Sequence, residues 1–277
     1  MPDAFALVRA GPRLRLHAGA LEVELAPRAG GRIAQIRFGT VEHLIAPSGD
    51  DAAPMIAWGC YPMVPWAGRI RRGRFVFEGR EWSLPLNMAP HAIHGVGFAL
   101  PWHVEAKSAA YAALSLTLPE DARWPFGGST RQEVRLSPHS LQLSLSVRAG
   151  RHAMPAAIGW HPWFRKPERM RFSPIAMYPR DHEGIAVSTI GAPASPPWDD
   201  CFINEQPIVI ERDGQHLRLS SSCRHWVVYD GAQHATCIEP QTGPPDAFNL
   251  SPCVLSPGDE LRADFRIEWL DTCDRTR

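Results

Sequence analysis

The sequence predicts an all-β protein built as a large antiparallel β-sandwich, and three observations support that prediction. Apolar and polar residues alternate with a period of two along many short segments, which is the pattern of half-buried strands. Turn-forming residues are frequent, with 27 prolines and 22 glycines among 277 residues. No segment of ten residues shows the apolar spacing of three and four that an amphipathic helix needs. A sandwich is therefore favoured over alternating β and α units.

Residues 140–148 form the clearest predicted strand. Every second residue from Leu141 to Val147 is apolar, and the residues between them are polar. The same alternation predicts further strands, in chain order, at residues 21–25, 74–77, 114–118, 131–136 and 261–269. Asp213-Gly214 separates two apolar runs and predicts a hairpin, and the turn at residues 78–80 predicts a second one.

Length and charge limit the possible classes of protein. One domain, residues 1–277, is expected, because all-β sandwiches reach this size and no linker or internal repeat interrupts the chain. The 29 basic and 29 acidic residues cancel, which argues against nucleic acid or an anionic membrane as a partner. Residues 1–25 hold no signal-peptide core, and no segment has the apolar length of a membrane span. We expect a cytoplasmic monomer or homodimer that acts on a small molecule.

The cysteines give no sign of a metal or redox centre. Six of them, at positions 60, 201, 223, 237, 253 and 273, form no Cys-x-x-Cys pair, so no zinc site is predicted. Because an export signal is not evident, reduced thiols are expected rather than disulfides.

The most informative segment is residues 237–249, in which one carboxylate is followed by a stiff turn. Glu239 is predicted at the end of a short strand, residues 235–238, and three prolines and a glycine follow it. A carboxylate on a rigid support suits proton transfer, which depends on accurate placement. A single glutamate is otherwise most often a solvated residue, so its role depends on what the rest of the chain brings to it.

Three other segments place functional side chains beside glycine, proline or aromatic residues. Residues 61–70 form a rigid turn that ends in Arg-Ile, residues 91–98 hold a His-Gly pair, and residues 158–164 hold a histidine between tryptophan and proline. The candidate residues in these segments are Arg69, His91, His94, Trp160 and His161. Because histidine titrates near neutral pH and a carboxylate is ionised there, a histidine and Glu239 together can donate and accept protons.

In this order, the motifs resemble those of the aldose 1-epimerase (galactose mutarotase-like) family. That family carries a turn ending in Arg-Ile, a His-Gly motif, a histidine beside an aromatic residue, an aspartate before a short strand, and a glutamate before a proline-rich turn. The matching residues are Arg69, His94, His161, Asp199 and Glu239, within roughly residues 20–270. The resemblance implies a supersandwich of antiparallel sheets and a mutarotase activity in carbohydrate metabolism, with a sugar substrate and no cofactor.

The resemblance also implies a role for each matching residue. Glu239 is the general base at the anomeric hydroxyl of a sugar, and His161 is the general acid at the ring oxygen. His94 would hydrogen-bond near that oxygen and stabilise developing charge. Arg69 and Asp199 would hold sugar hydroxyls, although the adjacent aspartate at position 200 is an equal candidate by sequence.

Two more side chains are candidates for substrate contact. His91 is either a second contact to the substrate or a loop residue. Trp160 is a candidate for the pocket together with Trp66 and Trp163, because a tryptophan face suits a sugar ring. The tryptophans in strand-like runs, at positions 82, 102, 226 and 269, are expected in the core instead.

Three alternatives remain open at the level of sequence. A hexose-6-phosphate 1-epimerase of the same fold would use the basic run from Arg69 to Arg74, although alternate strand residues face opposite sides. A non-catalytic sugar-binding protein would keep the fold without needing an acid–base pair. A metal hydrolase would use His91, His94 and either His161 or Glu239. The chain is also shorter than the larger galactose mutarotases and has glycine at position 68 where many relatives carry asparagine, which affects the expected sugar more than the reaction.

Overall fold

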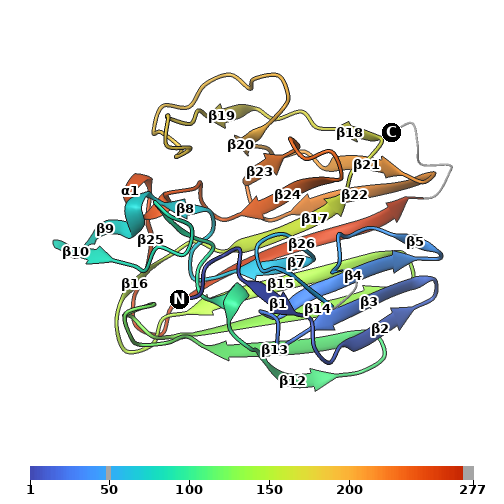
Figure 1. Cartoon of the computed structure of the whole chain (residues 1–277), viewed down its shortest axis with the longest axis horizontal. Coiled ribbons are helices and arrows are strands. Elements are labelled where there is room, and N and C mark those ends of the chain that lie inside the picture. The colour runs from blue at the N-terminus through green and yellow to red at the C-terminus, as the bar shows by residue number, and fades with distance from the viewer. Residues whose placement is uncertain (48–50, 271–277) are drawn as a thin grey trace.

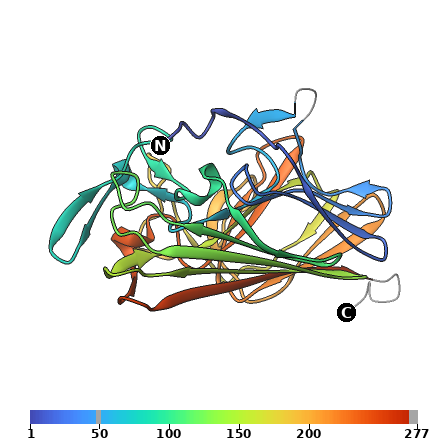
Figure 2. The same cartoon turned by 90° about the horizontal axis from the view of Figure 1, so that it is seen from below.

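Two large antiparallel sheets pack against each other in the computed structural model, which describes residues 1–47 and 51–270 (Figure 1). Figure 2 shows the long strands of one sheet as a layer beneath the rest of the molecule. The strand pairs in both sheets are antiparallel. The predicted all-β antiparallel sandwich is therefore confirmed.

One sheet has ten strands and carries the candidate site. Its order is β19-β20-β23-β24-β17-β7-β4-β3-β2, and β5 pairs with β4 beside this path. The strands are β2 (Leu14–Ala18), β3 (Leu21–Ala26), β4 (Arg32–Phe38), β5 (Val41–Glu42), β7 (Cys60–Met63), β17 (Gly159–Arg165), β19 (Ala176–Tyr178), β20 (Asp199–Ile203), β23 (His225–Tyr229) and β24 (Ala235–Gln241). The central strand β24 is buried at every residue.

The other sheet has eight strands in the order β12-β13-β14-β15-β26-β22-β21-β18. They are β12 (His103–Lys107), β13 (Tyr111–Thr117), β14 (Ser129–Ser137), β15 (Ser140–Arg148), β18 (Arg169–Arg171), β21 (Ile208–Arg212), β22 (Gln215–Ser221) and β26 (Glu260–Leu270). One of its two longest pairings joins β15 to β26 from one end of β15 to the other. The two partners are remote in sequence, so this pairing ties the C-terminal part of the chain to its middle.

The facing sides of the two sheets form one apolar core. On β15, the side chains of Leu141, Leu143, Leu145 and Val147 are buried there, as the sequence alternation predicts. The ten-stranded sheet contributes large side chains to the same core, among them Phe164 from β17. Burial of such surface stabilises a fold by roughly 25 cal/mol for each Å² of apolar area removed from water.

Short elements cover the opposite, outer face of the ten-stranded sheet and create a second apolar cluster. Tyr61 and Met63 on β7 point to this face, because their neighbour Cys60 belongs to the main core and side chains alternate along a strand. Residues of the covering segments, including Ile56 and Phe98, pack on them. The short elements outside the two large sheets are β1 (Leu7–Arg9), β6 (Ala52–Pro54), β8 (Arg69–Ile70), η1 (Arg71–Gly73), β9 (Arg74–Phe77), β10 (Arg80–Ser83), β11 (Ala92–Ile93), η2 (Gly97–Ala99), β16 (Met154–Ala156), α1 (Ala247–Leu250) and β25 (Cys253–Leu255). Among them, β9, β16, α1 and β25 contribute side chains to the main core instead.

Most predicted strands recur, and one boundary was wrong. The predicted hairpins join β21 to β22 and β9 to β10. The strand that was expected to end before Glu239 continues to Gln241, so the carboxylate lies inside β24 and not at its end. Pro240 is tolerated there because the pairing between β17 and β24 omits that position and needs no N–H from it.

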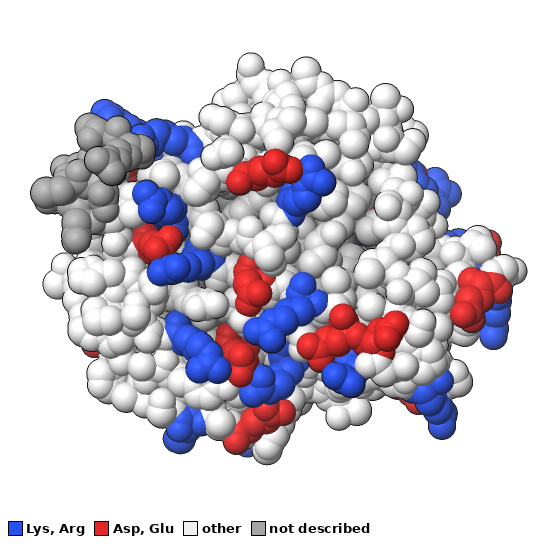
Figure 3. Space-filling view, turned by 180° about the vertical axis from the view of Figure 1, so that it is seen from behind, with Lys and Arg blue, Asp and Glu red and all other residues white. Residues whose placement is uncertain are grey.

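The surface charges, the helices and the cysteines can each be compared with what the sequence predicted. On the face shown in Figure 3, acidic and basic side chains are interleaved. No helix in residues 1–47 and 51–270 has both the length and the apolar character to cross a membrane. Five cysteines in the same residues are unpaired, namely Cys60, Cys201, Cys223, Cys237 and Cys253. Cys273 lies outside the described residues.

Candidate active site

The pairing of β17 with β24 brings a histidine and a glutamate face to face. Gly159 pairs with Gln241 and Trp163 pairs with Cys237, so the register sets His161 opposite Glu239. Both side chains project from the outer face of the sheet, away from the main core, because Trp160 beside His161 belongs to that core. Two segments 78 positions apart in the chain, at 161 and 239, thus meet at one point.

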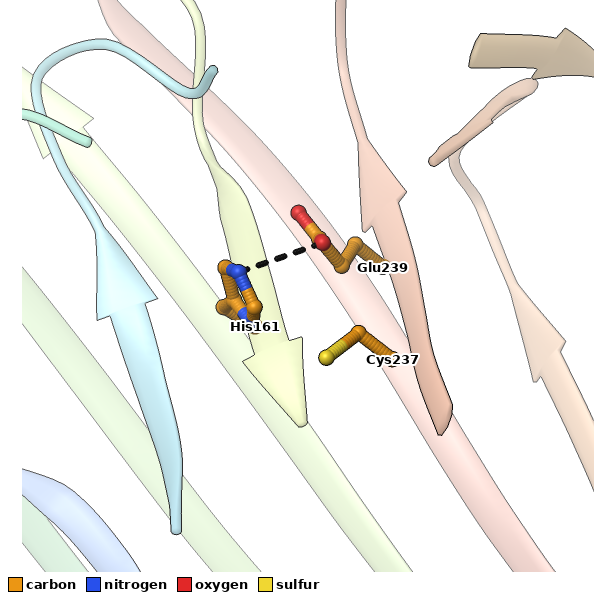
Figure 4. A group of neighbouring side chains, drawn as sticks. All are labelled: His161, Cys237 and Glu239. Carbon is orange, nitrogen blue, oxygen red and sulfur yellow. Dashed lines mark ion pairs between the residues drawn. The ribbon is translucent and has the colours of Figure 1, made fainter. Parts of the chain in front are cut away.

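The two side chains lie within ion-pair distance of each other. Nε2 of His161 lies 3.2 Å from Oε1 of Glu239 (Figure 4). The other carboxylate oxygen, Oε2, accepts a hydrogen bond of 3.0 Å from Nε2 of Gln241. His161 is 6% exposed and Glu239 is 2% exposed, so water contributes little to the solvation of either group.

Burial shifts both groups toward their uncharged forms. It raises the pKa of Glu239 well above the usual carboxyl value, and the nearby Asp199 carboxylate adds to that increase. Burial lowers the pKa of His161 to about 3. The glutamate is therefore a stronger base, and the protonated imidazole a stronger acid, than either would be in water.

Two aromatic rings stack against the imidazole of His161. The ring of Tyr61 has a centroid distance of 4.8 Å, and the ring of Trp163 lies at 5.5 Å with an interplanar angle of 10°. Both rings are anchored on one acceptor, because the carbonyl oxygen of Ile56 takes the Tyr61 hydroxyl at 3.0 Å and the Trp163 N–H at 2.7 Å. The histidine is thus fixed without a direct hydrogen bond to either ring.

The His-Gly motif has a steric cause. Gly95 has a φ of 72°, and a Cβ atom at that position would lie 1.9 Å from the carbonyl oxygen of Val64. His94 also has a positive φ, of 58°, which places its ring 4.9 Å from that of His161 at an angle of 90°. Its Nδ1 accepts the N–H of Gly68 at 3.3 Å, and burial lowers its pKa well below the usual value. His94 is therefore a neutral donor through Nε2.

An arginine and an aspartate lie at the same cavity. Arg69 from β8 donates to the carbonyl of Gly184 at 3.4 Å, and its guanidinium is 4.0 Å from Oδ2 of Asp199. Arg180 binds the same carboxylate oxygen at 2.6 Å. Asp199 therefore balances two arginines at this edge of the site.

The cavity has a volume of about 290 Å³, which is the size of site that takes a small ligand. Its polar lining is Arg69, His94, His161, Asp199, Glu239 and Gln241, and its apolar lining includes Phe5, Ile56, Met88, Ile93, Trp163 and Tyr229. Five of the seven residues that the sequence indicated as site residues line this one cavity.

Comparisons with known proteins agree with the architecture and with the motifs. The sequence model of the aldose 1-epimerase family matches residues 12–268. The chain belongs to the aldose 1-epimerase family. The uncharacterised protein YihR of Escherichia coli K12 is 25% identical over 271 residues, covering 86% of this chain and 87% of YihR.

Solved structures show the aldose 1-epimerase fold over nearly the full length. A galactose mutarotase-like protein of Clostridium acetobutylicum has a TM-score of 0.85 at 17% identity, covering 97% of this chain and 99% of that one. A galactose 1-epimerase of Lactobacillus acidophilus has a TM-score of 0.79 at 14% identity, covering 96% and 98%. At these identities the likeness establishes the fold alone. The match of the family model to residues 12–268 confirms the resemblance drawn from the motifs.

Two of the candidate residues, Trp160 and His91, do not line the cavity. Trp160 is fully buried on the core side of β17, where its N–H donates to Gln132 at 3.0 Å; alternation along the strand turns it away from the cavity. His91 is also outside the cavity, because its Nδ1 accepts the Arg72 N–H at 3.1 Å and its Nε2 lies 3.1 Å from the carbonyl oxygen of Glu183.

The tryptophans divide differently from the expectation. Of the three that were candidates for the pocket, Trp163 lines the cavity, whereas Trp66 packs against Trp124 in the core. Of the four tryptophans expected in the core, those at positions 102, 226 and 269 belong to it, whereas Trp82 is only partly buried against it.

The basic run after Arg69 does not converge on the cavity of this epimerase-family protein. Arg71 pairs with Asp181 at 2.5 Å and with Glu183 at 2.6 Å, and Arg72 pairs with Glu183 at 2.8 Å. Arg74 lies 3.6 Å from the carboxylate of Glu81. These carboxylates neutralise the run, which removes the sequence-based argument for a phosphate site.

Three buried polar side chains beside His161 and Glu239 were not among the residues predicted from the sequence. Gln241 and Cys237 lie two residues on either side of Glu239 in β24, so the period of two would have placed them on the same face. The third, Arg32, is fully buried, donates to four backbone carbonyls, and lies 5.0 Å from the ring centroid of Tyr61. No local sequence pattern predicts that Arg32 is buried, because most of its partners come from distant segments.

Proposed function

We propose that this protein interconverts the α and β anomers of an aldose by opening and closing the sugar ring. The observation that carries the proposal is the 3.2 Å contact between His161 and Glu239 inside a shared cavity. The two oxygens of a hemiacetal are bonded to the same carbon atom. A base and an acid in mutual contact can therefore reach both oxygens of one sugar.

Ring opening moves one proton from one hemiacetal oxygen to the other. Glu239, as a carboxylate, takes the proton of the C1 hydroxyl, and His161, as an imidazolium, gives its proton to the ring oxygen as the C1–O5 bond breaks. The electrons of the O–H bond form the carbonyl, and those of the C1–O5 bond go to O5. Rotation about C1–C2 followed by the reverse transfers gives the other anomer. The protein and the sugar exchange only protons, and no atom changes its oxidation state. The reaction therefore needs neither a metal nor a redox cofactor.

The pKa shifts favour both proton transfers. The reactive form of the pair is carboxylate plus imidazolium, and the form after ring opening is carboxylic acid plus neutral imidazole. Burial raises the pKa of Glu239 and lowers that of His161, so it stabilises the second form. Both forms carry the same single proton, and the pair therefore titrates as a unit rather than as two separate groups.

The rest of the cavity supplies binding groups for a sugar. His94 offers a neutral N–H donor, and Arg69 and Asp199 offer a guanidinium and a carboxylate for hydroxyl groups. Arg69 already faces Asp199, and the other arginines of the run bind acidic residues. These charges favour a neutral aldose over a sugar phosphate as the substrate.

Saturation-transfer NMR of anomer exchange, over a panel of free and phosphorylated aldoses, tests the proposal. The protein should accelerate exchange of at least one free aldose, and Glu239→Gln or His161→Asn should lower the rate about a hundred- to ten-thousandfold. Glu22→Gln on β3, an exposed glutamate, is the matched control and should leave the rate unchanged. Sugar binding without accelerated exchange would support the non-catalytic alternative, and preference for a phosphorylated sugar would support the epimerase of sugar phosphates.

A further inference from the structure

Three side chains with metal-binding atoms converge where the acid and the base meet. An imidazole nitrogen of His161, Sγ of Cys237 and a carboxylate oxygen of Glu239 all lie within 4.8 Å of one another, and all three residues are buried. In Figure 4 the sulfur of Cys237 points from β24 toward the imidazole on β17, on the same side as the Glu239 carboxylate. The proposed proton transfer does not use the thiol.

The ligand types and their spacing fit zinc. A thiolate, an imidazole and a carboxylate are the usual ligands of Zn²⁺, at about 2.3 Å for sulfur and about 2.0 Å for nitrogen and oxygen. Atoms at those distances from one ion lie three to four ångströms apart in a tetrahedral arrangement, in keeping with the 3.2 Å between Nε2 and Oε1. A shift of the Cys237 side chain of about an ångström would complete three sides of the tetrahedron. His161 and Glu239 line the cavity, from which water can supply a fourth ligand.

The charge balance also permits an ion at this buried place. A thiolate and a carboxylate together neutralise Zn²⁺, so the occupied cluster is uncharged and its burial is not opposed by a net charge. Zinc binds the thiolate and carboxylate forms, so binding displaces the protons that these groups carry and strengthens as the pH rises.

We propose that His161, Cys237 and Glu239 form an inhibitory site for Zn²⁺ or a similar thiophilic divalent ion. The inhibitory part rests on the proposed function, because the ion occupies the same nitrogen and oxygen that must exchange protons with the sugar. An exchangeable inhibitor fits better than a resident cofactor, since Nδ1 of His161 has no hydrogen-bond partner among the described residues. Zinc-binding histidines usually donate that second N–H to a carbonyl or carboxylate.

Cobalt titration tests the site without any measurement of turnover. Co²⁺ added to the metal-free protein in a non-thiol reductant should produce a thiolate-to-cobalt absorption band in the near ultraviolet, and Zn²⁺ should displace it. Cys237→Ala should abolish the band. Cys223→Ala removes a different buried thiol and should retain it. No band in the wild-type protein, or a band that persists in Cys237→Ala, would overturn the proposal.

Anomer exchange measured with and without Zn²⁺ tests the inhibition. In the wild-type protein, excess Zn²⁺ should reduce exchange to the level of Glu239→Gln, and a chelator should restore it. Cys237→Ala should lose this inhibition while it still accelerates exchange, and Cys223→Ala should keep it. Equal inhibition of Cys237→Ala and the wild type would contradict the site. A cobalt band in a protein that shows no exchange would instead contradict the proposed function and support the site.

Discussion

Two central strands of the same molecule, β15 and β24, use burial in different ways. On β15 the side chains from Leu141 to Val147 that face the core are all apolar, and the strand holds the eight-stranded sheet to the other layer. On β24 the residues facing the outer cluster are Cys237, Glu239 and Gln241, which are as deeply buried. Exclusion of water stabilises the fold through the first set and changes proton affinity in the second. Depth of burial alone therefore does not distinguish a structural strand from a functional one.

The largest expected effect separates activity from stability on β24. Glu239→Gln should lower anomer exchange about a hundred- to ten-thousandfold, while the free energy of unfolding stays equal or rises. In the folded protein the pKa of Glu239 is raised, so the wild type loses stability as the pH rises above the pKa of the unfolded chain, about 4.5. The glutamine variant lacks that loss. Urea unfolding of both proteins at pH 5 and pH 8 measures this loss of stability. A Glu239→Gln variant that is less stable than the wild type at pH 8 would contradict the expectation.

Leu143→Ala on β15 should give the opposite result. The substitution leaves a cavity in a fully buried part of the core, which should lower the free energy of unfolding by about 2–5 kcal/mol. The folded fraction should exchange anomers at the wild-type rate, because Leu143 faces away from the site. Urea denaturation and NMR exchange on the same sample would check both statements. A large loss of exchange rate with the fold intact would show that the two layers are coupled.

A buried histidine outside the cavity tests whether burial shifts pKa values without serving catalysis. His43 lies 2.9 Å from Oε1 of Gln215, and burial lowers its pKa to about 4. The unfolded chain binds a proton there near pH 6.5 and the folded chain does not, so stability falls as the pH drops through this range. Between pH 7 and pH 5 the loss is about 2 kcal/mol.

The variant His43→Gln should lack this part of the pH dependence and keep anomer exchange. Urea unfolding of both proteins at pH 7 and pH 5 isolates the contribution of His43 from that of other histidines. Identical pH dependence in the two proteins would contradict the assignment.

The smallest effect is expected on the exposed side of the eight-stranded sheet. Arg266 on β26 is 3.0 Å from a carboxylate oxygen of Glu268, and its side chain is 52% exposed. Arg266→Ala should change the free energy of unfolding by less than about 1 kcal/mol, because solvent screens such pairs. Chemical denaturation at low and high salt would measure it. A cost as large as that of Leu143→Ala would mean that the exposed face contributes more to stability than the buried leucines imply.

The sequence predicted the fold and the acid–base pair for different reasons. Alternation is a local signal, so it located β15 and the hairpins, while the resemblance to a known family supplied His161 and Glu239. Trp160 was misplaced because an aromatic residue beside a histidine looks like a pocket residue until strand alternation is applied to both. The sequence left His91 open between a substrate contact and a loop residue because its partner Glu183 comes from a distant segment, and Arg32 was missed for the same reason.

The carbonyl oxygen of Ile56 fixes both rings that hold His161. A main-chain atom of this kind survives every side-chain substitution at its own position, so point changes at residue 56 leave the anchor in place. Shortening or lengthening the connection between β6 and β7 would move it. The Ile56 side chain packs in the outer cluster, so a substitution there changes packing, whereas a change in the length of the connection would shift the rings that orient the imidazole.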